Sequence, residues 1–463
     1  MKTLALALRN LSRNRRRSLA TVLAMIVGAV SILMFGGYVQ NIVYGMQTGY
    51  VRDGGHLQLQ NRDYLLYGSG DPTAYGIANY RHVIDVIKQD PVLAAMLTVV
   101  SPTLEFGGIA GNFSAGVSRT VMANGTVVED QNAMQQWDDY GFPPDAAPLP
   151  LTDTSAESAV IGTGVARVLK LCKPLHVTDC PPPTVTASVE GAALPQDVAR
   201  LTASEGVDNG AQAAATTIEL LAATTGGAPN VTRLRVVKAE AQGVKAYDDV
   251  YVALHLSQAQ SLLYGRAKPE VTGIDIQLHH TDQIPQARAR LQRLLSTNLN
   301  AQPLAVYDFR ELNPYYGQTI GLFAAIFGFI AILIGAIVLF TVGNTMNAAV
   351  VERTVEIGTL RAIGLRRAGI RRLFVSEALA LGVIGAASGV ILALALAALI
   401  NASGLTWTPP GRTDPIHLHI RVWGETAMLS GTAIGLMAIA VLSAWWPARR
   451  AARLQVVEAL RHV

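Results

Sequence analysis

Charged side chains are scarce in this sequence: only 15% of its 463 residues are Asp, Glu, Lys or Arg, whereas half are hydrophobic, and the mean hydropathy is +0.31. Four runs lack Asp, Glu, Lys, Arg and His altogether: residues 19–44, 320–342, 378–400 and 428–446. Each run provides the roughly 20 residues that a helix needs to cross a hydrocarbon core of about 30 Å. Buried helices of a soluble protein, or a signal peptide for the first run, would explain one run but not four. The sequence therefore predicts a membrane protein with four transmembrane α-helices.

Signatures of catalysis are also missing. The sequence has no G-x-x-x-x-G-K-[ST] motif and no Gly-Lys pair, so it lacks the loop that cradles ATP phosphates in P-loop proteins. Gly-x-Ser-x-Gly is absent, and the uncharged runs lack the ionisable residues that proton pumps need at mid-membrane. His417 and His419 could share one face of a strand, but such a lone pair is more often polar surface than a metal site. We expect no catalytic residue, no metal and no cofactor on this chain.

Cysteine is nearly absent, with only Cys172 and Cys180, eight positions apart. An even number of cysteines in an oxidising compartment favours a disulfide, which here would close a small loop. Free thiols are the first alternative. A zinc site that uses His176 is a weaker alternative, because a fourth ligand is not evident.

The basic residues that are present lie beside the uncharged runs. Residues 1–18 contain six basic residues and no acidic one, and residues 343–372 contain six arginines against two glutamates. The tail 447–463 has four arginines against one glutamate, whereas 45–315 has 19 basic and 27 acidic residues, a net charge of −8. Because cytoplasmic flanks carry the excess of Lys and Arg, both termini and 343–372 are predicted in the cytoplasm. Anionic lipids of the membrane account for these basic segments, so no nucleic-acid partner is expected.

Together these patterns predict four transmembrane α-helices with a large α+β extracytoplasmic domain inserted between helices 1 and 2. In chain order the segments are a cytoplasmic amphipathic, basic segment (1–18), helix 1 (19–44), the extracytoplasmic domain (45–315), helix 2 (316–342), a cytoplasmic loop (343–372), helix 3 (373–400), a short external loop (401–427), helix 4 (428–446) and a cytoplasmic tail (447–463).

Hydrophobic periodicity indicates both strands and helices in the predicted external domain. Alternation over 54–60 and 272–280 predicts strands, whereas 80–91 and 283–299 have helical spacing. This mixture is typical of an α+β fold. Between 182 and 230 the composition shifts to Ala, Thr, Pro and Gly, and we interpret this stretch as an insertion or loop outside the core.

The segment 351–374, VERTVEIGTLRAIGLRRAGIRRLF, places six arginines and two glutamates between two apolar runs. Read as a helix, Glu352 and Glu356 are four residues apart and Arg353 is three residues before Glu356, so these side chains can pair. A basic loop that only fixes topology would explain the arginines but not the glutamates.

The same segment has an apolar stripe and two glycines. Gly358 inside a helix costs about 1 kcal/mol relative to Ala, which indicates close approach by another backbone. Gly364 suits a left-handed helix cap, after which a second helix begins. We therefore predict a helix, a turn and a helix that present a docking surface, with its apolar stripe made by Ile357, Leu360 and Ile363.

Glycines also recur at four-residue spacing in the last two uncharged runs. Gly385-x-x-x-Gly389 and Gly431-x-x-x-Gly435 offer small-residue faces on which transmembrane helices can pack closely.

Residues 352–390 resemble the conserved region of the MacB/LolE/FtsX superfamily of ABC-transporter permeases. That pattern is E-R-x-x-E-I-G-x-L-R-A-x-G, then I-x-x-x-F, then an acidic residue that opens the next span. The matching positions are Glu352, Arg353, Glu356, Ile357, Gly358, Leu360, Arg361, Ala362, Gly364, Ile370, Phe374 and Glu377. PARRAARLQVVEALR, at the end of the sequence, resembles the family's closing motif except at Gln455 and Val456, where the family favours an acid and a proline. Weaker similarity to the family's periplasmic domain lies in 159–171 and 247–263.

The resemblance implies that 351–364 is a coupling helix, which docks on a separate ATPase subunit that holds ATP and Mg. It implies a homodimer, or a heterodimer with a related permease, that passes ATP-driven closure to a periplasmic domain, which is called mechanotransmission. It also implies the inner membrane of a bacterium and, in some subfamilies, a periplasmic adaptor or lipoprotein as a further partner. The coupling residues would be Glu352, Arg353, Glu356, Ile357, Gly358, Leu360, Arg361 and Gly364.

Our leading hypothesis is a permease subunit that extracts or exports cargo such as lipoproteins, lipids or small molecules. The cargo would come from the periplasm or the outer leaflet of the inner membrane. The alternative is a transmembrane signalling or scaffold protein with an external sensor domain and a cytoplasmic partner, which the same rigid loop would serve.

Overall fold

The computed structural model describes residues 15–68, 71–144, 147–178, 180, 216–408 and 415–453. Most of the amphipathic segment 1–18, the middle of the predicted insertion and the end of the tail lie outside these residues. The chain divides into two compact units. We call Met1–Tyr44, Tyr315–Trp407 and His417–Val463 the helix bundle, and Gly45–Pro314 with Thr408–Ile416 the inserted domain.

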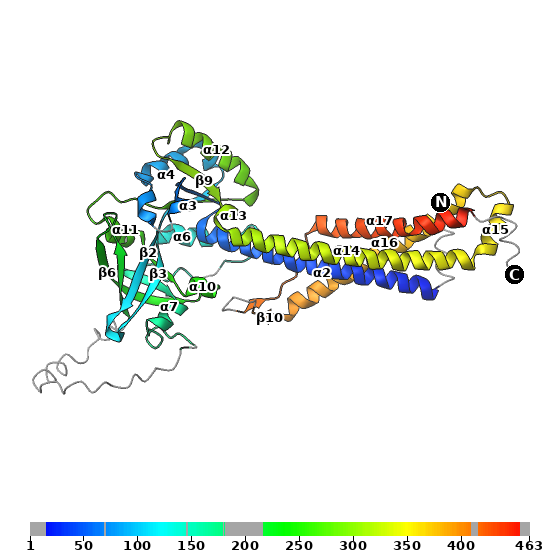
Figure 1. Ribbon diagram of the computed structural model, residues 1–463, viewed down its shortest axis with the longest axis horizontal. Coiled ribbons are helices and arrows are strands. Elements are labelled where there is room, and N and C mark those ends of the chain that lie inside the picture. Colours follow the sequence, from blue (N-terminus) through cyan, green and yellow to red (C-terminus); the bar gives the residue numbers. More distant parts are fainter. Residues whose placement is uncertain are drawn as a thin grey trace, which may run out of the picture. The chain divides into compact units, whose positions relative to one another are not determined.

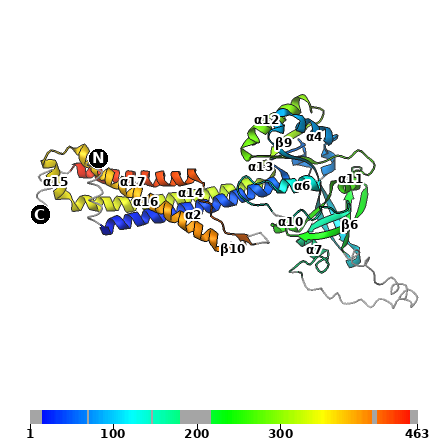
Figure 2. The ribbon, with the colours of Figure 1, turned by 180° about the vertical axis from the view of Figure 1, so that it is seen from behind.

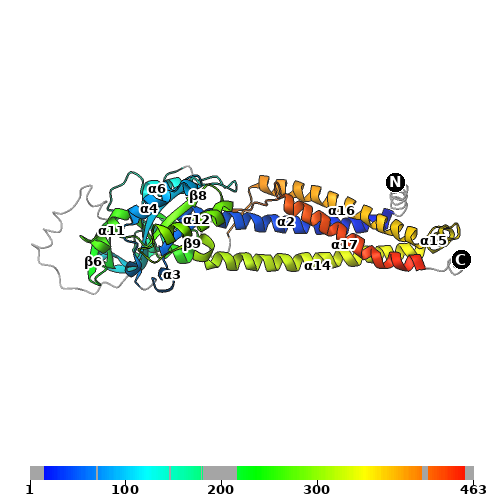
Figure 3. The same cartoon turned by 90° about the horizontal axis from the view of Figure 1, so that it is seen from above.

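Among the described residues, four helices are long and apolar enough to cross a membrane, and they run side by side (Figures 1 and 3). They are α2 (Arg15–Gly54), α14 (Pro314–Glu352), α16 (Arg367–Ser403) and α17 (Thr426–Arg453). Each is longer than its predicted span, because hydropathy marks only the part suited to hydrocarbon while helical hydrogen bonding continues beyond it. The helix α17, for example, continues through Pro447 to Arg453, beyond the apolar span predicted for helix 4.

The helix bundle has an apolar core to which all four helices contribute. Small residues dominate on α16 and α17, which lets these helices approach closely. The hydroxyl oxygens of Thr21 and Thr345 lie 2.9 Å apart and join α2 to α14. The buried core residues are Met25, Ala29, Val338, Val342, Met346, Val350, Ile357, Ile370, Phe374, Ala378, Leu381, Leu436, Ala440, Ala444, Ala448, Ala451 and Ala452.

The connection between α16 and α17 packs against α2. It contains two short strands, β10 (Thr406–Trp407) and β11 (Ile416–His417). The Asn401 side chain donates to the Ile420 carbonyl at 3.0 Å and accepts from the Ile420 N–H at 2.8 Å. The Arg421 N–H donates to the Gly37 carbonyl at 3.1 Å. This contact could not be predicted from the residues, because it depends on backbone groups.

The inserted domain is built on one nine-stranded sheet in the order β3-β7-β4-β6-β5-β2-β8-β1-β9. Because β3 pairs with both β7 and β2, the first six strands in this order close into a ring. The strands are β1 (Leu57–Asn61), β2 (Leu97–Asn112), β3 (Val117–Thr126), β4 (Ser158–Gly162), β5 (Thr217–Ala223), β6 (Pro229–Glu240), β7 (Tyr251–His255), β8 (Gly273–Leu278) and β9 (Leu304–Asp308).

Short helices cover this sheet, and α4 and α12 lie together near β9 (Figures 1 and 2). They are α3 (Tyr64–Tyr67), η1 (Pro72–Tyr75), α4 (Tyr80–Gln89), α5 (Pro91–Ala94), η2 (Phe113–Ala115), α6 (Val128–Gln135), α7 (Thr163–Val168), α10 (Lys245–Asp248), α11 (Leu256–Tyr264), η3 (Thr281–Gln283), α12 (Ile284–Thr297) and α13 (Phe309–Leu312). The strands and helices expected at 54–60, 80–91, 272–280 and 283–299 are present. The α+β fold expected of this domain is therefore confirmed.

The predicted insertion over 182–230 extends too far. β5 and the start of β6 fall within it, and Ile218 and Leu220 are fully buried in the sheet. Ile218, Leu220 and Ala222 alternate as a half-buried strand requires, but the surrounding Ala and Thr residues obscured that pattern.

Strand β8 buries both of its faces. Ile274 and Ile276 lie on the apolar face, whereas Asp275 and Gln277 are buried on the other. The Gln58 side-chain amide donates to Asp275 Oδ1 at 2.6 Å, and burial raises the pKa of Asp275 well above its ordinary value.

Candidate functional site

The loop between α14 and α16 holds one short helix, α15 (Thr354–Ala362). α14 ends at Glu352, and Arg353 has non-helical dihedral angles (φ −103°, ψ 19°). The Thr354 hydroxyl donates to the carbonyls of Val350 and Val351, at 3.1 and 2.8 Å, at this end of α14. A continuous helix over 351–364, with Glu352 and Glu356 one turn apart, is therefore wrong.

Arg353 points inward, away from any docking surface. Its Nη1 donates to Glu377 Oε1 of α16 at 2.9 Å, and the two side chains are only 12% and 3% exposed. The sequence placed Arg353 among the residues that meet a partner. The structure instead pairs it within the chain.

The predicted apolar stripe does not face one way. Ile357 is 3% exposed and belongs to the bundle core, and Gly358 beside it is buried, whereas Leu360 is 37% and Ile363 80% exposed. Successive residues of an α-helix are rotated by about 100° around its axis, so Ile363, six residues after Ile357, lies about 120° around the axis from it. Ile357 therefore anchors α15, and the other two are available to a partner.

Several large apolar side chains are exposed on and next to α15. We call them the docking face: Val355, Leu360, Ile363 and Leu365. Glu352 and Glu356 are exposed beside them, and Arg361 is half-buried. Exposed apolar groups with charged neighbours are typical of a protein–protein contact.

Gly364 ends α15 in the left-handed conformation predicted for it, with φ of +100°. The Leu365 N–H donates to the Leu360 carbonyl at 3.0 Å, and the Gly364 N–H donates to the Arg361 carbonyl at 3.1 Å. These two bonds make a Schellman motif. The cap fixes the turn that leads into α16.

The two glycine pairs of the membrane helices differ. A Cβ on Gly385 would lie 2.7 Å from Met25 Cβ, and one on Gly389 would lie 2.5 Å from Ala29 Cβ, so both pack tightly on α2. Within the described part of the chain, no atom lies within 4 Å of a Cβ placed on Gly431 or Gly435. None of the described residues packs on that second pair, because the face of α17 that carries it is turned away from the other helices, and its role in helix packing stays a prediction.

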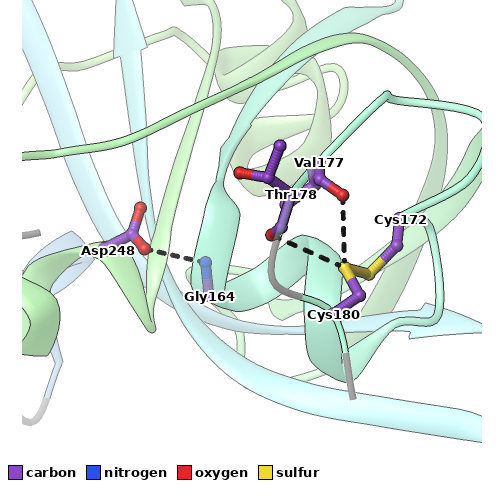
Figure 4. The surroundings of a disulfide bond; sticks show 6 residues. All are labelled: Gly164, Cys172, Val177, Thr178, Cys180 and Asp248. Atoms are coloured by element: carbon purple, nitrogen blue, oxygen red, sulfur yellow. Dashed lines mark hydrogen bonds between the residues drawn. A yellow bond between two sulfur atoms is a disulfide. The ribbon is translucent and has the colours of Figure 1, made fainter. Parts of the chain in front are cut away.

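Cys172 and Cys180 form a disulfide in the inserted domain (Figure 4). It follows α7, whose N-terminal N–H groups at Thr163 and Gly164 both donate to the Asp248 carboxylate at 2.8 Å. Of the described residues, no three His, Cys, Asp or Glu gather closely enough to hold a metal. His417 and His419 are exposed.

The inserted domain has a cavity of about 490 Å³ beside α4, α6 and α11. Its wall combines Ile84 and Leu256 with charged Arg81, Asp85 and Glu129. Because charges of both signs line it, the cavity does not select a ligand class.

Sequence reasoning matched Glu377 to a family motif but missed its pairing with Arg353. The signal was available, because an acidic residue at the start of an apolar run is costly unless it is paired. The contact of Ile420–Val422 with α2 had no comparable signal.

Comparison with known proteins gives the following similarities. Residues 322–456 match the FtsX-like permease C-terminal family. An uncharacterized ABC transporter permease from Methanocaldococcus jannaschii is 25% identical over 50% of this chain and 55% of its own length. The macrolide export ATP-binding/permease protein MacB of Escherichia coli is 30% identical over 42% of this chain and 28% of its own. The chain thus spans about half or less of the length of these relatives.

Among solved structures, the periplasmic region of MacB from Actinobacillus actinomycetemcomitans aligns with 57% of this chain and 94% of its own, at 12% identity and a TM-score of 0.30. The family match over residues 322–456 contains α15, α16, α17 and most of α14. Residues 322–456 of this multi-pass membrane protein are thus similar to the FtsX-like permease C-terminal family, and parts of the chain are similar to ABC transporter permeases, MacB of Escherichia coli among them.

Proposed function

We propose that this protein is the permease subunit of an ABC transporter, which couples ATP hydrolysis by a separate ATPase subunit to movement of its inserted domain. ATP and Mg would bind to the ATPase subunit, and this chain would contribute no cofactor or catalytic residue. The movement would extract or export cargo such as lipoproteins, lipids or small molecules from the periplasm or the outer leaflet of the inner membrane.

The observation that carries this proposal is the docking face of α15. A short helix fixed by Ile357 at one side and exposed at Ile363 on another is suited to receive a second protein. Because short connections join α15 to α14 before it and to α16 after it, a displacement of α15 changes the position of both helices. A loop that served topology alone would not need this anchored geometry.

The charge distribution supports a bacterial inner-membrane location with both termini and α15 in the cytoplasm. The arginines that follow α15, Arg366, Arg367, Arg371 and Arg372, are exposed. Residues 45–315 carry a net charge of −8, which fits the opposite side of the membrane.

A second permease copy, identical or related, would fit the exposed side of α14. Only 6% of the apolar window of α14 is buried, against 28–33% for the other three helices. Within the described chain, nothing lies within 4 Å of a Cβ placed on Gly317, Gly321 or Gly328. Such small residues allow two helices to approach closely in lipid. A periplasmic adaptor or a lipoprotein is a further partner that we propose for the inserted domain.

The first test is co-purification with an ABC ATPase subunit. Ile363→Asp places a charge on the docking face, and we expect it to reduce recovery of the ATPase by at least about tenfold. Leu66→Asp is the matched control, because Leu66 is an equally exposed apolar residue of the inserted domain (73% against 80%). Equal recovery with both variants would remove the docking face from the interface.

Charge reversal at Glu352 and Glu356 tests the coupling role itself. If Glu352→Lys with Glu356→Lys left both ATPase assembly and transport intact, the coupling role would be abandoned. A ligand of the inserted domain in a cell that offers no ATPase partner would favour a sensor or scaffold protein instead.

A further inference from the structure

Arg353 makes hydrogen bonds to three helices. Its backbone N–H donates to the Ala349 carbonyl of α14 at 3.2 Å, and its carbonyl accepts from the Ile357 N–H of α15 at 2.9 Å. Its side chain donates to Glu377 of α16 at 2.9 Å. One residue at the helix break thus connects α14, α15 and α16.

The ion pair lies in an apolar setting. Glu377 is 2% exposed, and its neighbours in α16, Phe374, Ala378 and Leu381, all belong to the buried bundle core. Moving two charges out of water costs free energy that their mutual attraction only partly offsets, so a buried pair is a weak source of stability. A pair of this kind instead fixes geometry, because either charge left alone would be strongly unfavourable.

The exposed arginines of the same segment have no such constraint. Arg371 is exposed on α16, four residues after Arg367, and a solvated arginine of this kind contributes little to the position of a helix. Arg353 differs from Arg371 in burial and in the partner that its side chain requires.

We propose that Arg353 and Glu377 form a joint that sets the direction of α15 relative to α14 and α16. Both are positioning residues: the docking face meets the partner, and the joint passes its displacement to the two membrane helices. The transfer step rests on the proposed function, but the joint itself is a property of this chain alone.

The test measures hydrogen–deuterium exchange of the full-length protein in nanodiscs of phosphatidylethanolamine and phosphatidylglycerol, without any ATPase. We expect Arg353→Gln and Glu377→Gln each to speed exchange of amides 354–365 by on the order of tenfold, while amides 383–399 of α16 stay protected. Arg371→Gln, the same substitution at the exposed site, leaves both regions unchanged.

The charge-swapped protein, Arg353→Glu with Glu377→Arg, distinguishes a specific pair from two residues that merely pack. Recovery of protection over 354–365 in the swap supports the joint. Unchanged exchange in both single variants overturns it, and so does a swap that stays deprotected while 383–399 remains protected. If Arg353→Gln folds poorly, Glu377→Gln provides the same comparison, because it keeps a neutral acceptor of the same shape.

A second readout separates this proposal from the proposed function. With an ATPase subunit present, Arg353→Gln keeps ATPase binding within about twofold but loses stimulation of ATP hydrolysis by cargo or permease, whereas Ile363→Asp loses binding itself. Failure of the wild-type protein to bind any ATPase would reject the proposed function and leave the exchange result standing. Full stimulation with Arg353→Gln would overturn the transfer role of the joint.

Discussion

Buried aspartates hold the ends of two short helices in the inserted domain. Asp248 is fully buried and accepts from the N–H groups of Thr163 and Gly164 and from the Thr163 hydroxyl, at 2.8, 2.8 and 2.6 Å. Asp90 accepts from the N–H groups of Val92 and Leu93 at the start of α5 and from Arg290 of α12. Each carboxylate therefore satisfies helix N–H groups that no other backbone group could reach.

Asp248→Ala is expected to lower the free energy of unfolding by about 2–4 kcal/mol, because it leaves buried donors without an acceptor. The control is Asp249→Ala, since Asp249 pairs with exposed Lys245 at 3.1 Å and such surface pairs contribute about 0–1 kcal/mol. Thermal unfolding of the purified protein, followed by intrinsic fluorescence, measures both. Equal losses for the two variants would contradict the role of Asp248.

The Asp90 carboxyl makes the stability of the inserted domain depend on pH. Hydrogen bonds from the Arg290 guanidinium hold the pKa of Asp90 below its ordinary value, with N–H donors of α5 adding to the effect. A carboxyl whose folded pKa is lowered stabilises above its unfolded pKa, which is about 3.9, and loses that contribution as the pH falls through the folded pKa.

We therefore expect wild type to exceed Asp90→Asn in Tm at pH 6, with the difference shrinking progressively below about pH 4. Asp85→Asn on the neighbouring helix α4 is the control, because Asp85 is exposed. A Tm difference between wild type and Asp90→Asn that stayed constant from pH 6 to pH 3 would reject this origin.

At the scale of elements, the same substitution of glycine by alanine should have opposite effects on stability in α16 and in α17. Gly389→Ala forces a methyl group to within 2.5 Å of Ala29 on α2, and overpacking of this kind costs typically about 1–3 kcal/mol. Gly431→Ala meets no neighbour within the described chain and gains helix propensity of up to about 1 kcal/mol.

We expect Gly389→Ala to lower Tm and monodisperse yield in detergent, and Gly431→Ala to leave both unchanged or raised. A thermal-shift series with size-exclusion chromatography checks this. If Gly431→Ala proved the more damaging variant, a partner outside this chain would have to pack on that face of α17.

The sequence predicts elements well where a single physical signal dominates. Uncharged runs located all four membrane helices, and alternation located β8 and the buried face of β1. The sequence failed where two signals overlapped. The polar residues around Arg353 read as one helix with paired charges, but the helix is interrupted at Arg353, whose side chain pairs with the buried Glu377. The position of Glu377 at the start of an apolar run indicates that it needs a partner, but no local pattern identifies Arg353, 24 residues earlier, as that partner.

Gly364 shows the opposite case. Its role as a left-handed cap follows from local chemistry alone, and the structure places it there. The direction in which Leu360 and Ile363 face could not be derived, because it depends on how Ile357 packs against α16 and α17.

At the scale of the whole molecule, the orientation in the membrane is the prediction most directly open to test. Thr359 of α15 and Thr225 of the turn between β5 and β6 are both exposed, and the native cysteines are bonded to each other. In intact cells that express variants with one added cysteine, a membrane-impermeant maleimide should label Thr225→Cys and not Thr359→Cys. Lysis should make Thr359→Cys react. Labelling of Thr359→Cys before lysis would reverse the topology.

Strand β2 has a consequence for how the inserted domain comes apart. Its first half, up to Thr103, pairs with β8 in the open part of the sheet, and its second half, from Leu104, pairs with β3 in the ring. The two parts of the domain therefore share one strand, and we expect them to unfold as a single cooperative unit. Amides in both halves of β2 should accordingly exchange with one common free energy of opening. A substitution that destabilises the ring should therefore also speed amide exchange in the half of β2 that pairs with β8.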